Sequence, residues 1–112
     1  MTAIKKETCE EQLRRMCKTI AEEITTGFKD KPNKSYTYLH KWMEDVYDIR
    51  YIVDSKKKYL GAKLMVAGGG PTIWVNTLTN EVEGSWGMDR CTHHFRDEIG
   101  LDDYNEEMYN CI

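Results

Sequence analysis

The sequence has no apolar run close to the roughly 20 residues that a membrane-spanning helix needs. Its 112 residues contain neither an internal repeat nor a low-complexity segment. The N-terminal stretch from Met1 to Glu7 becomes charged at once and lacks the apolar core of a signal peptide. These absences predict one domain spanning residues 1–112, located in the cytoplasm, where the four cysteines would stay reduced.

The C-terminal part of the chain is poor in basic side chains. Residues 68–112 hold 2 basic and 9 acidic groups, while the whole chain has a net charge of −3. Nucleic-acid-binding proteins concentrate Lys and Arg against the phosphates, so we expect no direct nucleic-acid partner. An acidic surface favours docking on a basic protein. The alternative is an acidic helix that is simply solvated.

Helical spacing of apolar residues predicts two helices in the N-terminal half. The first begins at a capping box, Thr8 with Glu11 three residues on, and Gly27 ends it before Pro32. Its apolar stripe comprises Leu13, Met16, Cys17, Ile20, Ile24 and Phe28. Ser35 begins the second helix. The stripe of that helix comprises Leu39, Trp42, Met43 and Val46.

From residue 49 onward the apolar period shortens to two. This pattern predicts four strands over 49–54, 59–66, 72–76 and 82–86, joined as an antiparallel meander. A short helix over 101–112 follows. Its predicted stripe comprises Leu101, Tyr104, Met108 and Cys111 or Ile112. The expected fold is therefore a single α+β domain in the order α-α-β-β-β-β-α.

One face of the predicted sheet is apolar enough to form the core, with the first helix as its cover. It carries Leu60, Ala62, Leu64, Val66, Ile73, Val75 and Val82. The opposite face places Tyr59, Met65 and Trp74 among polar residues. Exposed aromatic patches of this kind mark interfaces. Covering of that face by the second or third helix is nevertheless the favoured expectation, and contact with a partner is the alternative.

Three consecutive glycines precede the third strand. Phosphate-binding loops place a helix after their glycines, whereas Pro71 and a strand follow here, so a tight turn is the favoured interpretation. A small-ligand site for a nucleotide or another anion is the alternative. Its residues would be Gly68, Gly69, Gly70, Trp74, Trp86, Asp89 and Arg90.

The segment from Cys91 to His94 has residue types found in metal and nucleophile sites. Zinc ligands usually come in spaced pairs, and adjacent histidines on a strand point apart, so we predict no metal. A structural zinc site remains a third interpretation, with Cys9, Cys17, Cys91 and His93 as its ligands. A cysteine nucleophile needs an oriented histidine, and the pattern supplies only the residue types. We therefore predict neither catalysis nor a cofactor.

The turn and hairpin carry a resemblance to a known group of proteins. The residues concerned are Gly69-Gly70-Pro71, Ile73, Val75, Thr77, Val82, Gly84 and Trp86-Gly87, followed by an acidic helix with Tyr109 and Cys111. Over residues 48–112 the chain resembles short, mostly uncharacterised proteins of bacteriophages and mobile elements. Small acidic α+β proteins of that context are similar to anti-CRISPR inhibitors. The resemblance implies a non-enzymatic inhibitor that binds a defence protein, such as a CRISPR effector, in the bacterial cytoplasm.

On this hypothesis the partner surface combines the acidic helix with the outward tryptophan. The residues expected to bind the partner are Trp74, Asp97, Glu98, Asp102, Asp103, Glu106 and Glu107. A homodimer is a further alternative.

Overall fold

The computed structural model describes residues 8–27 and 35–112, with side chains for 8–27 and 38–112. The described chain is an α+β domain with three helices and one five-stranded antiparallel sheet. The elements are α1 (Cys9–Thr25), α2 (Ser35–Glu44), β1 (Asp48–Val53), β2 (Tyr59–Ala67), β3 (Thr72–Asn76), β4 (Glu81–Trp86), β5 (Asp89–His94) and α3 (Leu101–Asn110). The predicted α+β class is confirmed, while the predicted number of strands is too low by one.

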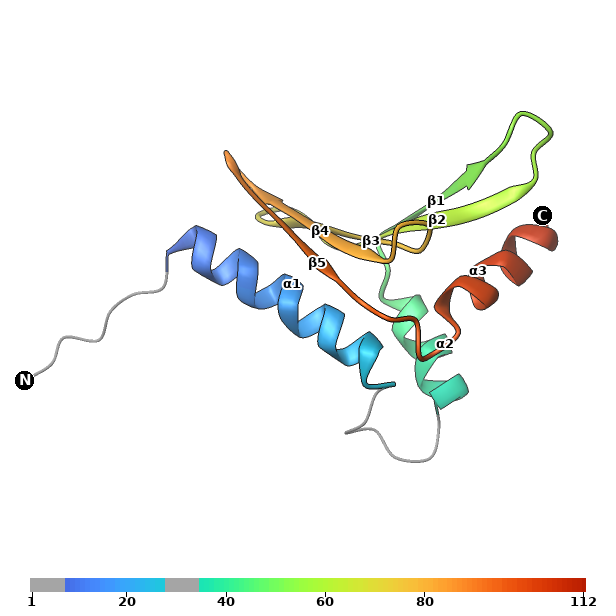
Figure 1. Cartoon of the computed structure of the whole chain (residues 1–112), viewed down its shortest axis with the longest axis horizontal. Coiled ribbons are helices and arrows are strands. Elements are labelled where there is room, and N and C mark those ends of the chain that lie inside the picture. Colours follow the sequence, from blue (N-terminus) through green and yellow to red (C-terminus); the bar gives the residue numbers. More distant parts are fainter. Residues whose placement is uncertain (1–7, 28–34) are drawn as a thin grey trace, which may run out of the picture.

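The sheet is a meander in which each strand pairs with its neighbour in sequence, in the order β1-β2-β3-β4-β5. All three helices lie on one side of it (Figure 1). Helix α1 packs against β4 and β5, and α3 packs against β2. Their buried side chains and those of the sheet form one core cluster. We call this covered side the inner face of the sheet.

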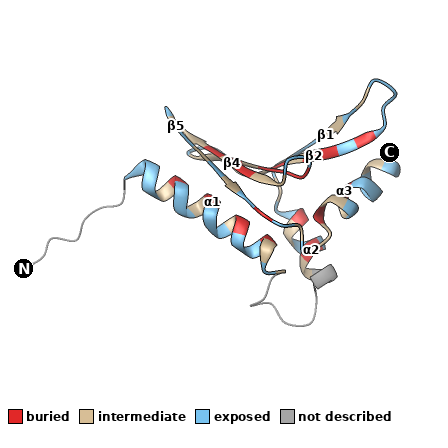
Figure 2. Cartoon of the chain, in the orientation of Figure 1, coloured by how far each residue is buried: buried red, intermediate tan, exposed pale blue. Residues whose placement is uncertain are grey.

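Helix α1 follows the predicted pattern closely. The Thr8 hydroxyl accepts a hydrogen bond from the Glu11 backbone N–H at 3.1 Å, and Gly27 follows the helix with a φ of +67°. Leu13, Cys17 and Ile24 are fully buried, and exposed positions lie between them at helical spacing (Figure 2). The predicted positions Phe28 and Pro32 lie outside the described residues.

The strand that the sequence did not reveal is β5. Its residues are polar and charged, so the segment lacks the apolar alternation that predicts a strand. Pairing with β4 forms it instead, through a two-residue turn at Gly87 and Met88. Cys91 of β5 lies opposite Gly84 of β4 on the inner face. Strand β5 is the edge of the sheet and packs against α1 on that face.

The predicted faces of β2 are wrong at its first two residues. The pairing of β1 with β2 shifts register so that Ile52 lies opposite Gly61 while Val53 lies opposite Tyr59. Leu60 is the extra residue of this bulge, and a bulge reverses the alternation of side chains. Tyr59 is therefore buried in the core, whereas Leu60, predicted as core, is 43% exposed.

The stripe of α3 also differs from the prediction. Leu101 is buried as expected, but Asn105 occupies the next buried position and donates a 2.9 Å hydrogen bond to the Leu101 carbonyl. Tyr109 packs on the core one turn further on. Met108 is 48% exposed. Cys111 and Ile112 are exposed as well, so these three residues do not belong to the stripe.

The second face of the sheet is open. The buried apolar residues of α1, α2 and α3 belong to the inner core, and none of these helices lies over the other face in residues 8–27 and 35–112 (Figure 1). The expectation that the second or third helix covers this face is therefore wrong for the described chain.

The helices within residues 8–27 and 35–112 are too short or too polar to cross a bilayer.

Candidate functional site

The open side of the sheet places Trp74 at its centre. Strand register sets Met65 directly opposite Trp74 on β2 and Glu83 opposite it on β4, while Arg50 of β1 lies opposite Lys63. We call these five side chains the outer face. They come from four consecutive strands, so a rigid hydrogen-bonded sheet fixes their spacing.

Two cations flank the Trp74 ring. The Arg50 guanidinium carbon lies 5.4 Å from the ring centroid and the Lys63 ammonium nitrogen lies 5.3 Å from it. Both distances are within the range of a cation–π interaction. These contacts and the strand neighbours leave Trp74 half-buried without any helix over it.

The charges of the outer face are largely paired with one another. Arg50 donates to Asp48 at 2.9 Å, and Lys63 lies 3.2 Å from a Glu83 carboxylate oxygen. The result is an aromatic ring at the centre of a locally neutral row of ion pairs. Such a row can present an apolar contact without a strong field of one sign.

An open groove of about 330 Å³ begins at the edge of Trp74. It continues over β4 and β5, where Ser85, Arg90 and Thr92 line it. Trp74 is the aromatic residue of its lining, and Glu83 and Arg90 are the charged ones. The groove extends the outer face toward the sheet edge at β5.

On the inner face, the Asp102 carboxylate accepts hydrogen bonds from two hydroxyl groups. The Tyr59 hydroxyl and the Thr77 hydroxyl each lie 2.8 Å from Oδ1 of Asp102. The Thr77 hydroxyl in turn accepts the Ala62 backbone N–H at 2.8 Å. Burial, together with the neighbouring Asp102 carboxylate, holds the pKa of Tyr59 above its ordinary value, so this phenol stays protonated and donates. We call Tyr59, Thr77 and Asp102 the inner network.

Asp97 also has a structural role, at the start of α3. Its two carboxylate oxygens accept the backbone N–H groups of Leu101 at 2.8 Å and of Asp102 at 2.9 Å. These donors have no intrahelical partner at a helix N-terminus, so Asp97 caps the helix although Gly100 precedes it directly.

Four of the predicted acidic partner residues remain exposed: Glu98, Asp103, Glu106 and Glu107. Glu98 lies 3.5 Å from Arg96. The other three line an open groove of about 580 Å³ on α3, with Leu39 of α2 and Tyr104 among its apolar walls. We call this the acidic groove.

The acidic groove and Trp74 lie on opposite sides of the sheet. Helix α3 reaches β2 through Tyr59 on the inner face, whereas Trp74 points from β3 to the outer face. A single flat partner surface therefore cannot contact both. The sequence could not show this separation, because it depends on which side of the sheet α3 packs against.

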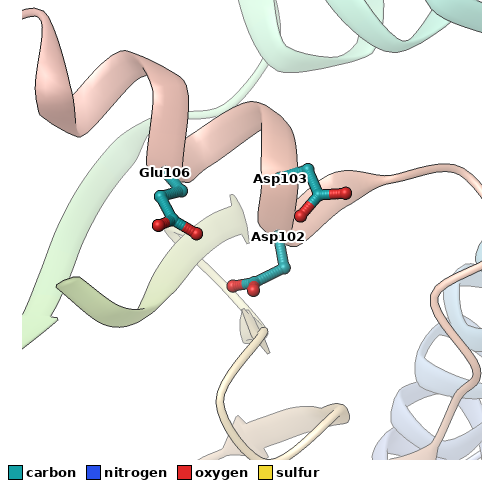
Figure 3. A group of neighbouring side chains, drawn as sticks. All are labelled: Asp102, Asp103 and Glu106. Carbon is teal, nitrogen blue, oxygen red and sulfur yellow. The ribbon is translucent and has the colours of Figure 1, made fainter.

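Three carboxylates on the first turns of α3 come close together. Ligand oxygens of Asp102, Asp103 and Glu106 lie within 4.8 Å of one another (Figure 3). Within residues 8–27 and 35–112 this is the one such group of three or more His, Cys, Asp or Glu side chains. The inner network already accounts for the Asp102 carboxylate, and we assign the group no metal.

The residues of the alternative ligand site do not form one site, although Trp74 and Arg90 line the same groove. Trp86 shares the inner face with Gly84, while Trp74 and Arg90 lie on the outer side. Gly68, Gly69 and Gly70 are exposed in the β2–β3 turn, where Gly69 has a φ of +93°. That conformation requires glycine for backbone geometry, which supports the interpretation as a tight turn. Asp89 pairs with Trp86 at the end of the hairpin.

The cysteine and histidine candidates separate in the same way. Cys17 and Cys91 are in contact, while Cys9 is exposed on α1 and His93 lines a different groove with Ala21. The four proposed zinc ligands therefore do not form one cluster. His94 lines the same groove as His93. The neighbour of the Cys91 thiol is therefore the Cys17 thiol and not an imidazole.

Comparison with models of known protein families, with curated proteins and with solved structures finds no match for this chain.

Proposed function

We propose that this chain is a non-enzymatic binding protein that inhibits a bacterial defence complex, with the outer face as its principal contact surface. The observation that carries the proposal is Trp74, which stands at the centre of a five-stranded sheet on the face that no described helix covers. A rigid sheet presents this ring at little cost in conformational entropy on binding.

The composition of the outer face supports a protein partner. Trp, Met and Arg are enriched at protein–protein interfaces, and binding hot spots favour Trp and Arg. Trp74, Met65 and Arg50 are adjacent here across three strands. The ion pair between Lys63 and Glu83 forms a polar boundary beside the ring. This arrangement matches an apolar centre with a charged rim.

The class of partner follows from the resemblance and from the charge. The resemblance to phage and mobile-element proteins favours a defence nuclease, and such an enzyme presents a basic surface to nucleic acid. The exposed carboxylates of Asp103, Glu106 and Glu107 would attract that surface from a distance. Because α3 lies on the other side of the sheet, its charges act on the rate of encounter rather than as the central contact.

Replacing Trp74 with alanine is expected to weaken binding to the target about thirtyfold, the loss typical of an interface hot spot. A panel of purified CRISPR effector complexes would be immobilised and the equilibrium affinity measured by biolayer interferometry, with DNA cleavage assayed in parallel. The dissociation rate should rise and inhibition of cleavage should fall together.

The matched control is Met108→Ala, which truncates an exposed apolar residue on α3. It should bind like the original chain. Equal binding of the Trp74→Ala variant, with its thermal stability intact, would reject the outer face as the contact surface. Failure of every effector to bind the original chain would reject the proposed function.

Reversing three exposed charges of α3 should instead slow association. The triple variant Asp103→Lys, Glu106→Lys and Glu107→Lys is expected to bind a basic effector about tenfold more slowly at low salt. The difference should shrink at about 0.5 M salt because screening shortens the range of the field. Association rates measured at both salt concentrations test this.

The control for the charge variant carries Glu10→Lys, Glu22→Lys and Glu23→Lys on α1. It changes the net charge by the same amount as the α3 variant. If both triple variants slow association equally, the effect belongs to net charge and α3 has no directional role. A faster dissociation rate for the α3 variant would place α3 inside the interface.

A further inference from the structure

Two cysteines distant in sequence meet at one point of the core. Cys17 comes from the middle of α1 and Cys91 from β5, and their sulfur atoms lie 3.1 Å apart. Gly84 on β4 leaves the space that both thiols fill. A Cβ atom at Gly84 would lie 2.5 Å from the Cys17 sulfur and 3.1 Å from the Cys91 sulfur.

The two thiols differ in their access to solvent. Cys17 has no exposed surface, whereas Cys91 is only half-buried and also lies 3.8 Å from the Leu13 carbonyl oxygen. The remaining cysteines, Cys9 and Cys111, are exposed on other parts of the chain. The contact between Cys17 and Cys91 is therefore a specific feature of the packing of α1 on the sheet.

We propose that Cys17 and Cys91 are a redox-sensitive pair that forms an intramolecular disulfide bond and thereby locks α1 onto the edge strand β5. The sulfur atoms need to approach by only roughly 1 Å to reach bonding distance. This inference is independent of the proposed binding function, because it depends on the inner face and not on the outer one.

The oxidant is a small-molecule disulfide such as oxidised glutathione. The Cys91 thiol gives its proton to solvent, and the resulting thiolate attacks one sulfur of the oxidant. The oxidant's sulfur–sulfur bond breaks, and one small thiolate leaves. Cys17 then gives its proton to solvent, its sulfur attacks the Cys91 sulfur, and the second small thiolate leaves. The protein loses two hydrogen atoms, and the oxidant is reduced to two thiols.

Accessibility and acidity set the order of these steps. Burial, followed by the contact with Cys91, raises the pKa of Cys17 to about 12, so its thiol stays protonated and makes a poor first nucleophile. Cys91 is the less buried of the two and is therefore the one that would react first with the oxidant. The second step is intramolecular, and the contact between the two sulfur atoms gives it a high effective concentration.

The bond would link positions 74 residues apart. It would join α1 to β5, one of the two strands against which that helix packs. Closing a loop of this length removes much conformational freedom from the unfolded chain. The apparent melting temperature should therefore rise by about 10 °C on oxidation.

The test uses the full chain with Cys9→Ser and Cys111→Ser, which removes only exposed thiols. This variant is incubated with oxidised glutathione, unfolded, and treated with an alkylating reagent. Intact mass should show the loss of two hydrogen atoms, no alkylation and a monomer. The melting temperature should rise by about 10 °C, and dithiothreitol should reverse the rise.

Alkylation of both remaining cysteines after oxidation would overturn the proposal, as would a lasting glutathione adduct on Cys91 with Cys17 still free. The matched control adds Cys91→Ser to the same background. An equal rise in its melting temperature under oxidant would also overturn the proposal, because that variant cannot form the bond.

Discussion

Replacing Phe95 with alanine is expected to lower the free energy of unfolding by about 4 kcal/mol. Phe95 directly follows β5, is only 2% exposed and belongs to the core cluster shared by the helices and the sheet. Its backbone N–H donates to the Asn80 carbonyl at 3.0 Å, which holds the main chain in place at this position. Removing the ring leaves a cavity between elements that are already packed.

Urea denaturation followed by far-UV circular dichroism measures this loss. A domain of this size has a free energy of unfolding of roughly 5–15 kcal/mol, so the variant should unfold at a much lower urea concentration. Met88→Ala is the matched control, because Met88 lies just before the other end of β5 and is 99% exposed. Its effect should stay within about 0.5 kcal/mol. Similar effects of the two variants would show that Phe95 does not anchor the core.

Replacing Asp102 with alanine is expected to reduce the free energy of unfolding by about 3 kcal/mol. The change removes the acceptor for the hydroxyl groups of Tyr59 and Thr77, each 2.8 Å from Oδ1. Both residues are buried, so each donor would lose its hydrogen bond to a charged group where water cannot easily replace it. The inner network joins α3 to β2 and to the end of β3, and its loss should loosen that helix.

Asp103→Ala is a close control for this experiment. Both aspartates lie in the first turn of α3 and share the favourable interaction with the helix N-terminus. Only Asp102 accepts the two hydroxyl groups, whereas Asp103 is exposed. The difference between the two free energies of unfolding therefore isolates the inner network. A difference below about 0.5 kcal/mol would show that the network contributes nothing to stability.

The Asp102 result bears directly on the proposed function. The sequence predicts the same partner-binding role for Asp102 as for Asp103, Glu106 and Glu107, the other three carboxylates of α3. The structure separates Asp102 from the other three by its contacts. In a binding experiment that reversed all four charges, a loss of folding stability could not be distinguished from a loss of electrostatic attraction to the partner. The variant that reverses only the exposed three avoids this.

Much of the fold could be predicted because local patterns encode it. The spacing of Leu13, Cys17 and Ile24 specifies one buried side of α1, and Thr8 and Gly27 mark its two ends. The alternation of Ile73, Trp74 and Val75 correctly places the tryptophan on the face opposite the core. Each of these features depends on residues that are near one another in the chain.

The rest depends on partners that are distant in sequence. Strand β5 has no apolar pattern of its own and exists because β4 offers it hydrogen bonds and α1 covers its inner side. The bulge at Leu60 reverses the face of Tyr59. Gly61 beside it is a local signal of a bulge, because a glycine inside a strand often marks one, but the apolar alternation by itself does not show the reversal. Periodicity predicts a face only while the register stays regular.

The candidate site also has features that the sequence predicts and features that only the tertiary structure shows. Trp74 could be named from the sequence because strand alternation carried it outward, and the acidic character of α3 was visible in its composition. Three other features depend on long-range packing. Trp74 and α3 lie on opposite sides of the sheet, Asp102 accepts hydrogen bonds from two hydroxyl groups, and Cys17 contacts Cys91 beside Gly84. Short-range spacing sets which way a side chain points within its element, whereas the contacts between elements set what that side chain meets.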